Sequence, residues 1–222
     1  MRGGTYGWHA ADKGFVAISW TNTESCMPSW GGKNPRLGNN PFVMAVPRKK
    51  GHIVLDMAMS QYSYGKLQVT RLKGATLPYP GGFDKEGNLT SEPGPIEESM
   101  RILPMGYWKG SGFAILLDTL AAVLSEGLPT NQIDQVGKGS CTGCSQVFIV
   151  FDPRQLGGEA FTDQVADSVA DYVMRPVILF VIVFSISLIM VLIASASESG
   201  LLAEKYWPRP LTAACHRSSM WV

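Results

Sequence analysis

The most constraining feature of the sequence is a strong helical pattern that follows directly on a loop rich in proline and glycine. Apolar residues recur there at the i, i+3, i+4, i+7 spacing of an amphipathic helix: Phe113, Leu116, Leu117, Leu120, Ala121 and Leu124. Ser111 is the expected N-cap of this helix and Gly127 its expected C-cap. Because Ile115 and Val123 lie off the apolar stripe, we expect the helix to be buried on more than one face.

The junction between the loop and this helix brings a cation and a large aromatic ring together. Trp108 and Lys109 are followed by three small residues, Gly110, Ser111 and Gly112. Backbone N–H groups at a helix start attract anions, and a neighbouring lysine strengthens that attraction. Small residues let a ligand approach the backbone closely. The junction therefore predicts one half of a cofactor site.

The rest of the first 174 residues mixes strands and helices without strict alternation. We expect buried strands at residues 15–20, 41–46, 52–57 and 146–151, the middle two being an antiparallel pair. We expect helices at residues 60–72, interrupted at Gly65, and at 161–174, where Phe161, Val165, Val169 and Val173 share one face. Residues 22–40 and 74–95 are predicted loops. This pattern indicates an α/β domain built on a mixed sheet.

Composition and charge exclude several classes of protein. Hydrophobic residues make up 45% of the chain and charged residues 17%, which is typical of a globular protein. The net charge is +1, and the longest basic run is residues 48–50, so we expect no nucleic-acid partner. We interpret that run as a solvated turn between two strands.

Motifs for metal binding, redox chemistry and the common nucleotide-binding folds are weak or absent in the sequence. Cys141 and Cys144 form a CxxC without a second pair, so we expect two incidental thiols and no metal. The histidines are His9, His52 and His216, and none is paired in sequence with a carboxylate or a nucleophile. The glycines of residues 3–7 have no preceding strand, so a Rossmann fingerprint is absent.

The C-terminal part of the sequence differs in style from the rest. Residues 177–196 are twenty residues without a charge, between Arg175 and Glu198, and residues 197–222 show no pattern. Three interpretations of the apolar run stay open: a membrane anchor, a buried C-terminal helix, or the product of a shifted reading frame. The sequence thus divides into residues 1–174, 177–196 and 197–222.

Eight short blocks, in order over about residues 1–174, resemble the malate/L-lactate dehydrogenase-type oxidoreductases. They are MRGGTYGW (1–8), WTN (20–22), WGG (30–32), GNNP (38–41), VLDMAMS (54–60), GGFD (81–84), GNLT (87–90) and LPMGYWKGSG (103–112). The resemblance implies a non-Rossmann α/β/α fold on a mixed sheet, a cytoplasmic homodimer, and NAD(P)H as cofactor. It implies reduction of a 2-oxoacid or a diketo sugar acid.

The resemblance also implies two groups of cofactor-binding residues. They are His52, Ile53, Val54, Leu55, Asp56, Met57 and Ala58 in one group, and Trp108 and Lys109 in the other. Physical chemistry agrees, because a strand edge offers backbone groups to an adenosine, Lys109 suits a phosphate and Trp108 can pack on a ring. Alone, Asp56 would be interpreted as the cap of a strand end and Trp108 as core.

The sequence departs from the family at both ends. Family members carry a proton-donating histidine in a segment before the block at residues 1–8, and a Gly-His-Glu cofactor contact near the C-terminus. Neither is found in this sequence, so we expect a truncated enzyme with no catalytic residue, inactive alone. The alternative is a non-catalytic protein derived from this fold and anchored in a membrane by residues 177–196.

Overall fold

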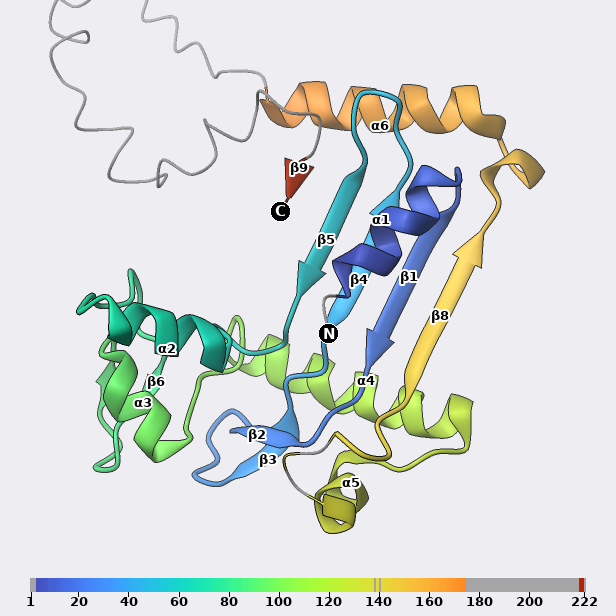
Figure 1. Cartoon of the computed structure of the whole chain (residues 1–222). Coiled ribbons are helices and arrows are strands. Elements are labelled where there is room, and N and C mark those ends of the chain that lie inside the picture. The colour runs from blue at the N-terminus through green and yellow to red at the C-terminus, as the bar shows by residue number, and fades with distance from the viewer. Residues whose placement is uncertain (1–2, 138, 140, 175–219, 222) are drawn as a thin grey trace, which may run out of the picture.

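The computed structural model describes residues 3–137, 139, 141–174 and 220–221 (Figure 1). Its strands are β1 Val16–Thr21, β2 Ser25–Pro28, β3 Pro35–Gly38, β4 Phe42–Val46, β5 Ile53–Met57, β6 Gly82–Phe83, β7 Leu89–Thr90, β8 Gln146–Phe151 and β9 Met220–Trp221. Its helices are α1 Gly4–Asp12, α2 Tyr64–Leu72, α3 Pro93–Ser99, α4 Trp108–Ser125, α5 Thr130–Gly137, α6 Gly158–Met174 and the 3₁₀ turn η1 Pro153–Gln155.

One sheet organises the chain, with its strands in the order β8-β1-β4-β5-β9. The pairs β8–β1, β1–β4 and β4–β5 are antiparallel, and β5–β9 is parallel. Ile18 in β1 lies opposite Met44 on one side and Ile149 on the other. The four predicted strands and the antiparallel pairing of β4 with β5 are therefore confirmed.

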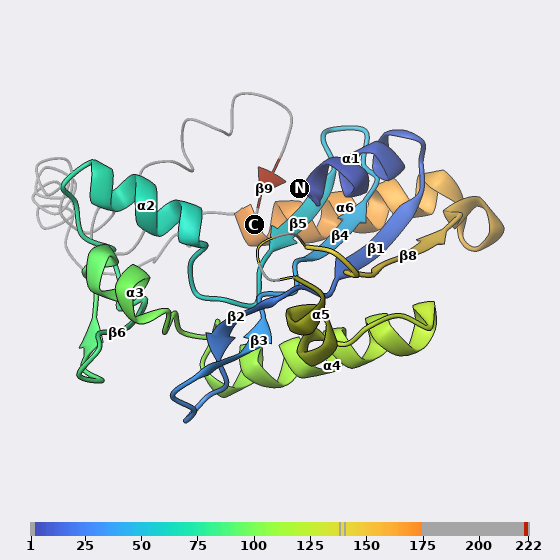
Figure 2. The same ribbon diagram turned by 60° about the horizontal axis from the view of Figure 1, so that its bottom comes forward.

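Helices cover both faces of this sheet. Figure 2 shows α1 on one side of the strands and α4 on the other, while α6 runs across the end of the sheet where β4 turns into β5 (Figure 1). Gly7 of α1 and its N-cap Gly3 allow that helix to lie close to the sheet: a Cβ on Gly7 would be 2.7 Å from Cγ1 of Val43, and one on Gly3 would be 2.8 Å from Cγ2. These glycines thus serve helix–sheet packing.

The main core lies between the sheet, α4 and the α2–α3 region. Trp20 is buried there and its indole N–H donates to the carbonyl of Leu117, with 3.1 Å between N and O. The fully or nearly buried members of this core are Trp20, Met27, Met59, Leu67, Leu77, Ile96, Ile102, Ala114, Leu117 and Ala121. They come from segments far apart in the sequence, so this cluster holds the candidate site in place.

The predicted bounds and burial of α4 are wrong at three points. The helix begins at Trp108 with Tyr107 as N-cap, so Ser111 lies inside it. Its C-cap is Glu126, the residue before Gly127, in the left-handed conformation. The outer face is exposed rather than buried, and its apolar members are Ile115, Leu116, Leu120, Val123 and Leu124.

Other predicted elements also need correction. Helix α2 begins after its N-cap Ser63 and runs without interruption through Gly65. The predicted loop at residues 74–95 contains β6, β7 and the start of α3. Strand β8 is mostly exposed rather than buried. The helix predicted at residues 161–174 is present as part of α6. The residues expected to share its apolar face are exposed: Phe161, Val165, Val169 and Val173.

The apolar run 177–196 and the predicted C-terminal helix lie outside the described residues. Across the described part of the chain, no single helix has the length and apolarity of a bilayer crossing; only α4 and α5 together do, bent by 76°.

Candidate functional site

The end of β5 and the start of α4, the two predicted halves of the site, are held together by backbone hydrogen bonds. The N–H of Met105 donates to the carbonyl of Met59, and the N–H of Gln61 donates to the carbonyl of Leu103, both at 2.7 Å. On its other side, the N–H of Met59 donates to the carbonyl of Asn39, also at 2.7 Å. The chain leaving β5 is therefore fixed against the loop that leads into Trp108 and Lys109.

Trp108 and Lys109 both reach solvent at the first turn of α4. The side chain of Trp108 is 65% exposed, and Nζ of Lys109 lies 5.9 Å from the centroid of its ring. No carboxylate of the described residues forms an ion pair with Lys109. Its charge is thus available to an anionic ligand beside an exposed aromatic face.

The positive charge at this helix start comes from the lysine side chain and much less from free backbone groups. The N–H groups of Lys109, Gly110 and Ser111 donate to the carbonyls of Gly106, Met105 and Tyr107, at 3.2, 2.8 and 3.2 Å. These donors are engaged within the protein, so the predicted anion site of exposed N–H groups is wrong at these three positions.

The small residues after Lys109 were predicted to let a ligand approach the backbone, but the structure gives a different reason for two of them. A Cβ on Gly110 would lie 2.3 Å from the carbonyl oxygen of Met105, so glycine is required by the protein's own backbone. Ser111 is buried and its Oγ accepts the N–H of Trp30 at 3.1 Å. Only Gly112 faces open space.

Two aromatic residues that the sequence analysis did not single out flank this turn. Tyr107 has φ +61° and ψ −113°, a conformation rare for any residue but glycine. Its ring centroid lies 5.0 Å from that of Trp30, at 50° between the planes. The backbone strain leaves no trace in composition or periodicity, so sequence patterns could not have revealed it.

Strand β5 presents its predicted site residues in different ways. Val54 is fully buried under α1. Asp56 is exposed, but its Oδ2 accepts the N–H of Gly4 at 2.8 Å, so its carboxylate caps the N-terminus of α1. Ile53, Leu55, Met57 and Ala58 are half-buried. Ile53 and Val54 also lie opposite β9, so this stretch of the strand edge is not free.

His52 lies at the other end of β5, away from the Met59–Met105 contact. Its Nδ1 accepts the N–H of Arg48 at 3.1 Å, and its Nε2 is 2.8 Å from Oδ1 of Asp12. Its ring meets that of Trp8 edge-on, with centroids 4.9 Å apart. The residue borders a cavity of about 300 Å³ between α1, the β4–β5 turn and α6. These contacts give His52 a structural anchor.

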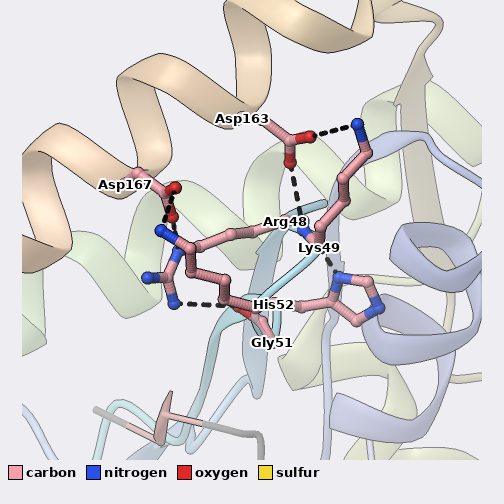
Figure 3. Close-up of polar contacts among 7 residues, drawn as sticks. Arg48, Lys49, Gly51, His52, Asp163 and Asp167 are labelled. Atoms are coloured by element: carbon pink, nitrogen blue, oxygen red, sulfur yellow. Dashed lines mark hydrogen bonds and ion pairs between the residues drawn. The ribbon is translucent and has the colours of Figure 1, made fainter.

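The basic turn at residues 48–50 is docked on α6 (Figure 3). Nε of Arg48 and Nζ of Lys50 lie 2.6 and 2.7 Å from the carboxylate of Asp167. The backbone N–H of Lys49 donates to Asp163 at 3.0 Å. Hydrogen bonds from Lys50 and Arg48 hold the pKa of Asp167 below its usual value, and the Lys49 N–H lowers the pKa of Asp163. The turn therefore fastens α6 to the sheet.

The CxxC lies in the loop before β8. Burial raises the pKa of the Cys144 thiol to about 11, helped by the nearby Cys141 and Glu24. The carboxylate of Glu24 accepts the N–H groups of Gly139 and Cys141, both at 2.6 Å. These contacts fix the loop and keep the Cys144 thiol protonated at neutral pH.

Comparison with known proteins matches most of the chain. A family model described as malate/L-lactate dehydrogenase matches residues 1–177. The 2,3-diketo-L-gulonate reductases of Escherichia coli and Citrobacter koseri are each 49% identical over 173 residues, 78% of this chain and 52% of the relative. The chain thus spans about half the length of these curated relatives.

Solved structures agree with this match. Δ1-piperideine-2-carboxylate reductase from Pseudomonas syringae superposes with a TM-score of 0.68 at 30% identity, over 78% of this chain and 54% of that one. Sulfolactate dehydrogenase from Methanocaldococcus jannaschii gives 0.68 at 28% identity, over 81% and 52%. The chain belongs to the malate/L-lactate dehydrogenase family of oxidoreductases.

Proposed function

We propose that this chain carries the cofactor-holding part of an NAD(P)-dependent reductase for a 2-oxoacid or a diketo sugar acid, similar to 2,3-diketo-L-gulonate reductase. The observation that supports this most is the Met59–Met105 hydrogen bond. It joins the segment after β5 to the turn that presents Trp108 and Lys109, so the two predicted groups of residues, distant in the sequence, lie close together. In such an enzyme NAD(P)H supplies the hydride for the substrate carbonyl.

The residues at the junction fit an anionic, ring-bearing cofactor. Lys109 is an exposed ammonium without an ion-pair partner in the described ranges, which suits a phosphate. Trp108 offers an exposed ring face beside it. Leu55, Met57 and Ala58 supply a half-buried apolar strand end. In this proposal His52, Val54 and Asp56 act by holding β5 in place, because their side chains are engaged with α1 and its neighbours.

The first test is the affinity of the 222-residue chain for NADH, measured by calorimetry. We expect Lys109→Ala to weaken binding about tenfold, since it removes one charge-assisted contact with a phosphate. Lys73→Ala is the matched control, because Lys73 is an exposed lysine at the far end of α2. Equal affinities of the wild type and Lys109→Ala would contradict the proposed role of Lys109.

We further propose that the 222 residues alone bind cofactor without turnover. The chain matches only 52% of its curated relatives' length. NADH oxidation should be assayed with 2,3-diketo-L-gulonate, pyruvate and oxaloacetate. Turnover at the rate of a full-length homologue would overturn this proposal.

A membrane-anchored, non-catalytic protein is the second candidate function. Its support is the uncharged run at residues 177–196, long enough to cross a bilayer. Carbonate extraction of membranes from cells that express the chain separates the two: retention in the pellet supports an anchor, and recovery in the supernatant contradicts it.

A further inference from the structure

We propose that Tyr107 and Trp30 form an aromatic wall that receives the flat ring of the bound cofactor beside Lys109. This inference rests on the proposed function and names two further positioning residues for it. Its starting point is the strained backbone of Tyr107, at φ +61° and ψ −113°. Such strain concentrates at functional sites, where the surrounding structure enforces it.

The strain decides where the ring of Tyr107 points. The mirror image of this conformation is ordinary extended backbone, so a glycine here would adopt it without strain. The neighbouring Gly106 also has a positive φ, +58°, and the turn is closed by the Tyr107 N–H on the carbonyl of Pro104 at 3.1 Å. A tyrosine kept at such a position directs its ring out of the turn, toward Trp30.

Trp30 is itself held in register with α4. Its backbone N–H donates to the buried Oγ of Ser111, one turn into the helix. The side chains remain half open to solvent, at 49% exposed for Trp30 and 51% for Tyr107. Trp108 follows Tyr107 directly in the sequence, is also exposed, and has Nζ of Lys109 5.9 Å from its ring centroid. Aromatic faces beside a cation suit a planar ring that is linked to a phosphate.

The test compares NADH binding by four variants of the full chain. Tyr107→Gly should weaken binding about 5–10-fold, the usual size of one aromatic stacking contact. Its melting temperature should stay within about 3 °C of the wild type, because relieved strain offsets the lost Trp30 contact. Tyr107→Phe keeps the ring and should bind within about twofold of the wild type. Trp30→Leu should weaken binding as Tyr107→Gly does.

The matched control is Glu126→Gly at the opposite end of the same helix. Glu126 also has a positive φ, +51°, so this variant relieves backbone strain without removing an aromatic ring. It should bind NADH as the wild type does. A loss of affinity equal to that of Tyr107→Gly would show that helix strain, and not the aromatic wall, affects binding, and would overturn the inference.

Two ligand fragments show which ring is received. Reduced nicotinamide mononucleotide carries the nicotinamide ring and one phosphate, whereas ADP carries the adenine ring system and two phosphates. A weaker affinity of Tyr107→Gly for either fragment supports the wall and identifies the ring. Unchanged affinity for NADH and both fragments, while Lys109→Ala loses NADH affinity, overturns this inference alone. Absence of NADH binding by the wild type overturns the proposed function together with it.

Discussion

At the scale of single residues, Asp56 shows how a side chain of the predicted site acts on an element distant in the sequence. Helix α1 has no side-chain cap of its own, and the carboxylate of Asp56 on β5 accepts the N–H of Gly4 at its first turn. A negative group at a helix N-terminus stabilises both the unpaired N–H and the helix dipole. Asp56 therefore joins α1 to the strand on which the cofactor is proposed to lie.

Asp56→Ala should lower the free energy of unfolding by about 1 kcal/mol, the usual cost of losing a helix cap. Asp56→Asn keeps an acceptor oxygen and should recover most of that loss. Urea unfolding followed by circular dichroism measures both values. Equal stability of the wild type and the alanine variant would show that the Asp56–Gly4 contact contributes nothing.

Cys144 offers a second prediction at this scale. Because burial raises the pKa of its thiol to about 11, little thiolate is present at pH 8. Alkylation by iodoacetamide, followed by peptide mass spectrometry, should be slow at pH 8 and accelerate about tenfold per pH unit toward pH 10. An alkylation rate at pH 8 equal to that of a free peptide thiol would contradict the protected position of Cys144.

At the scale of elements, a strand or helix was predictable from the sequence only where its own residues carry a distinctive pattern. The runs that became β1, β4, β5 and β8 are rich in β-branched and aromatic residues, so their existence was predictable. The start of α4 was not, because its N-cap Tyr107 has no capping side chain and is imposed by tertiary contacts. The exposure of β8 was missed because an apolar run has the same pattern whether its faces are covered or open.

The candidate site likewise has features that could be predicted from the sequence and features that could not. The resemblance to a family predicted Trp108 and Lys109, and the fold places both on an exposed turn. Periodicity could not predict that Gly110 is small to fit the Met105 carbonyl, because this is a long-range effect of backbone packing. Trp30 lies in a predicted loop rich in glycine and proline, where no sequence pattern indicates a role for it. Its contact with Tyr107 forms only in the folded chain.

The docking of α6 on the β4–β5 turn gives an acid-dependent prediction. The pKa values of Asp163 and Asp167 are lowered in the folded chain. The two ionised carboxylates therefore stabilise the folded state above the unfolded pKa of 3.8, and this stabilisation is lost as the pH falls below 3.8 and through the lowered pKa values. Hydrogen exchange of α6 amides should therefore accelerate relative to those of β1 between about pH 5 and pH 3.

The double variant Asp163→Asn and Asp167→Asn serves as the control for that measurement. It lacks the titrating carboxylates, so protection of its α6 amides should be weaker at neutral pH and should change less on acidification. Identical pH profiles for the wild type and the double variant would show that these ion pairs do not fasten the helix.

At the scale of the whole molecule, many large apolar side chains of the described residues are exposed. They lie on α4, β8 and α6 and include Leu116, Leu120, Leu124, Phe148, Val150, Phe161 and Tyr172. Extended apolar surface of this kind marks an interface. We propose from these exposed side chains that the chain associates with a second copy of itself through α4.

Light scattering after size exclusion should give a mass above the 24.1 kDa of one chain. Leu116→Glu with Leu124→Glu should shift the chain toward one copy, while its melting temperature changes little because both side chains are already 60% exposed. A monomeric wild type, or a double variant with unchanged mass, would contradict association through α4.

The position of β1 between β8 and β4 has a consequence for the order of folding. Its partner β4 follows soon after it, but β8, its other neighbour, begins only at Gln146. The contact between Arg48 and Asp167 likewise joins residues 119 positions apart. During synthesis the β1–β4–β5 meander must therefore wait with both edges open, since β8 and β9 both come later in the chain, and such edges pair readily with other chains. Refolding yield should fall steeply as protein concentration rises, because β8 competes with neighbouring molecules for the same row of hydrogen bonds.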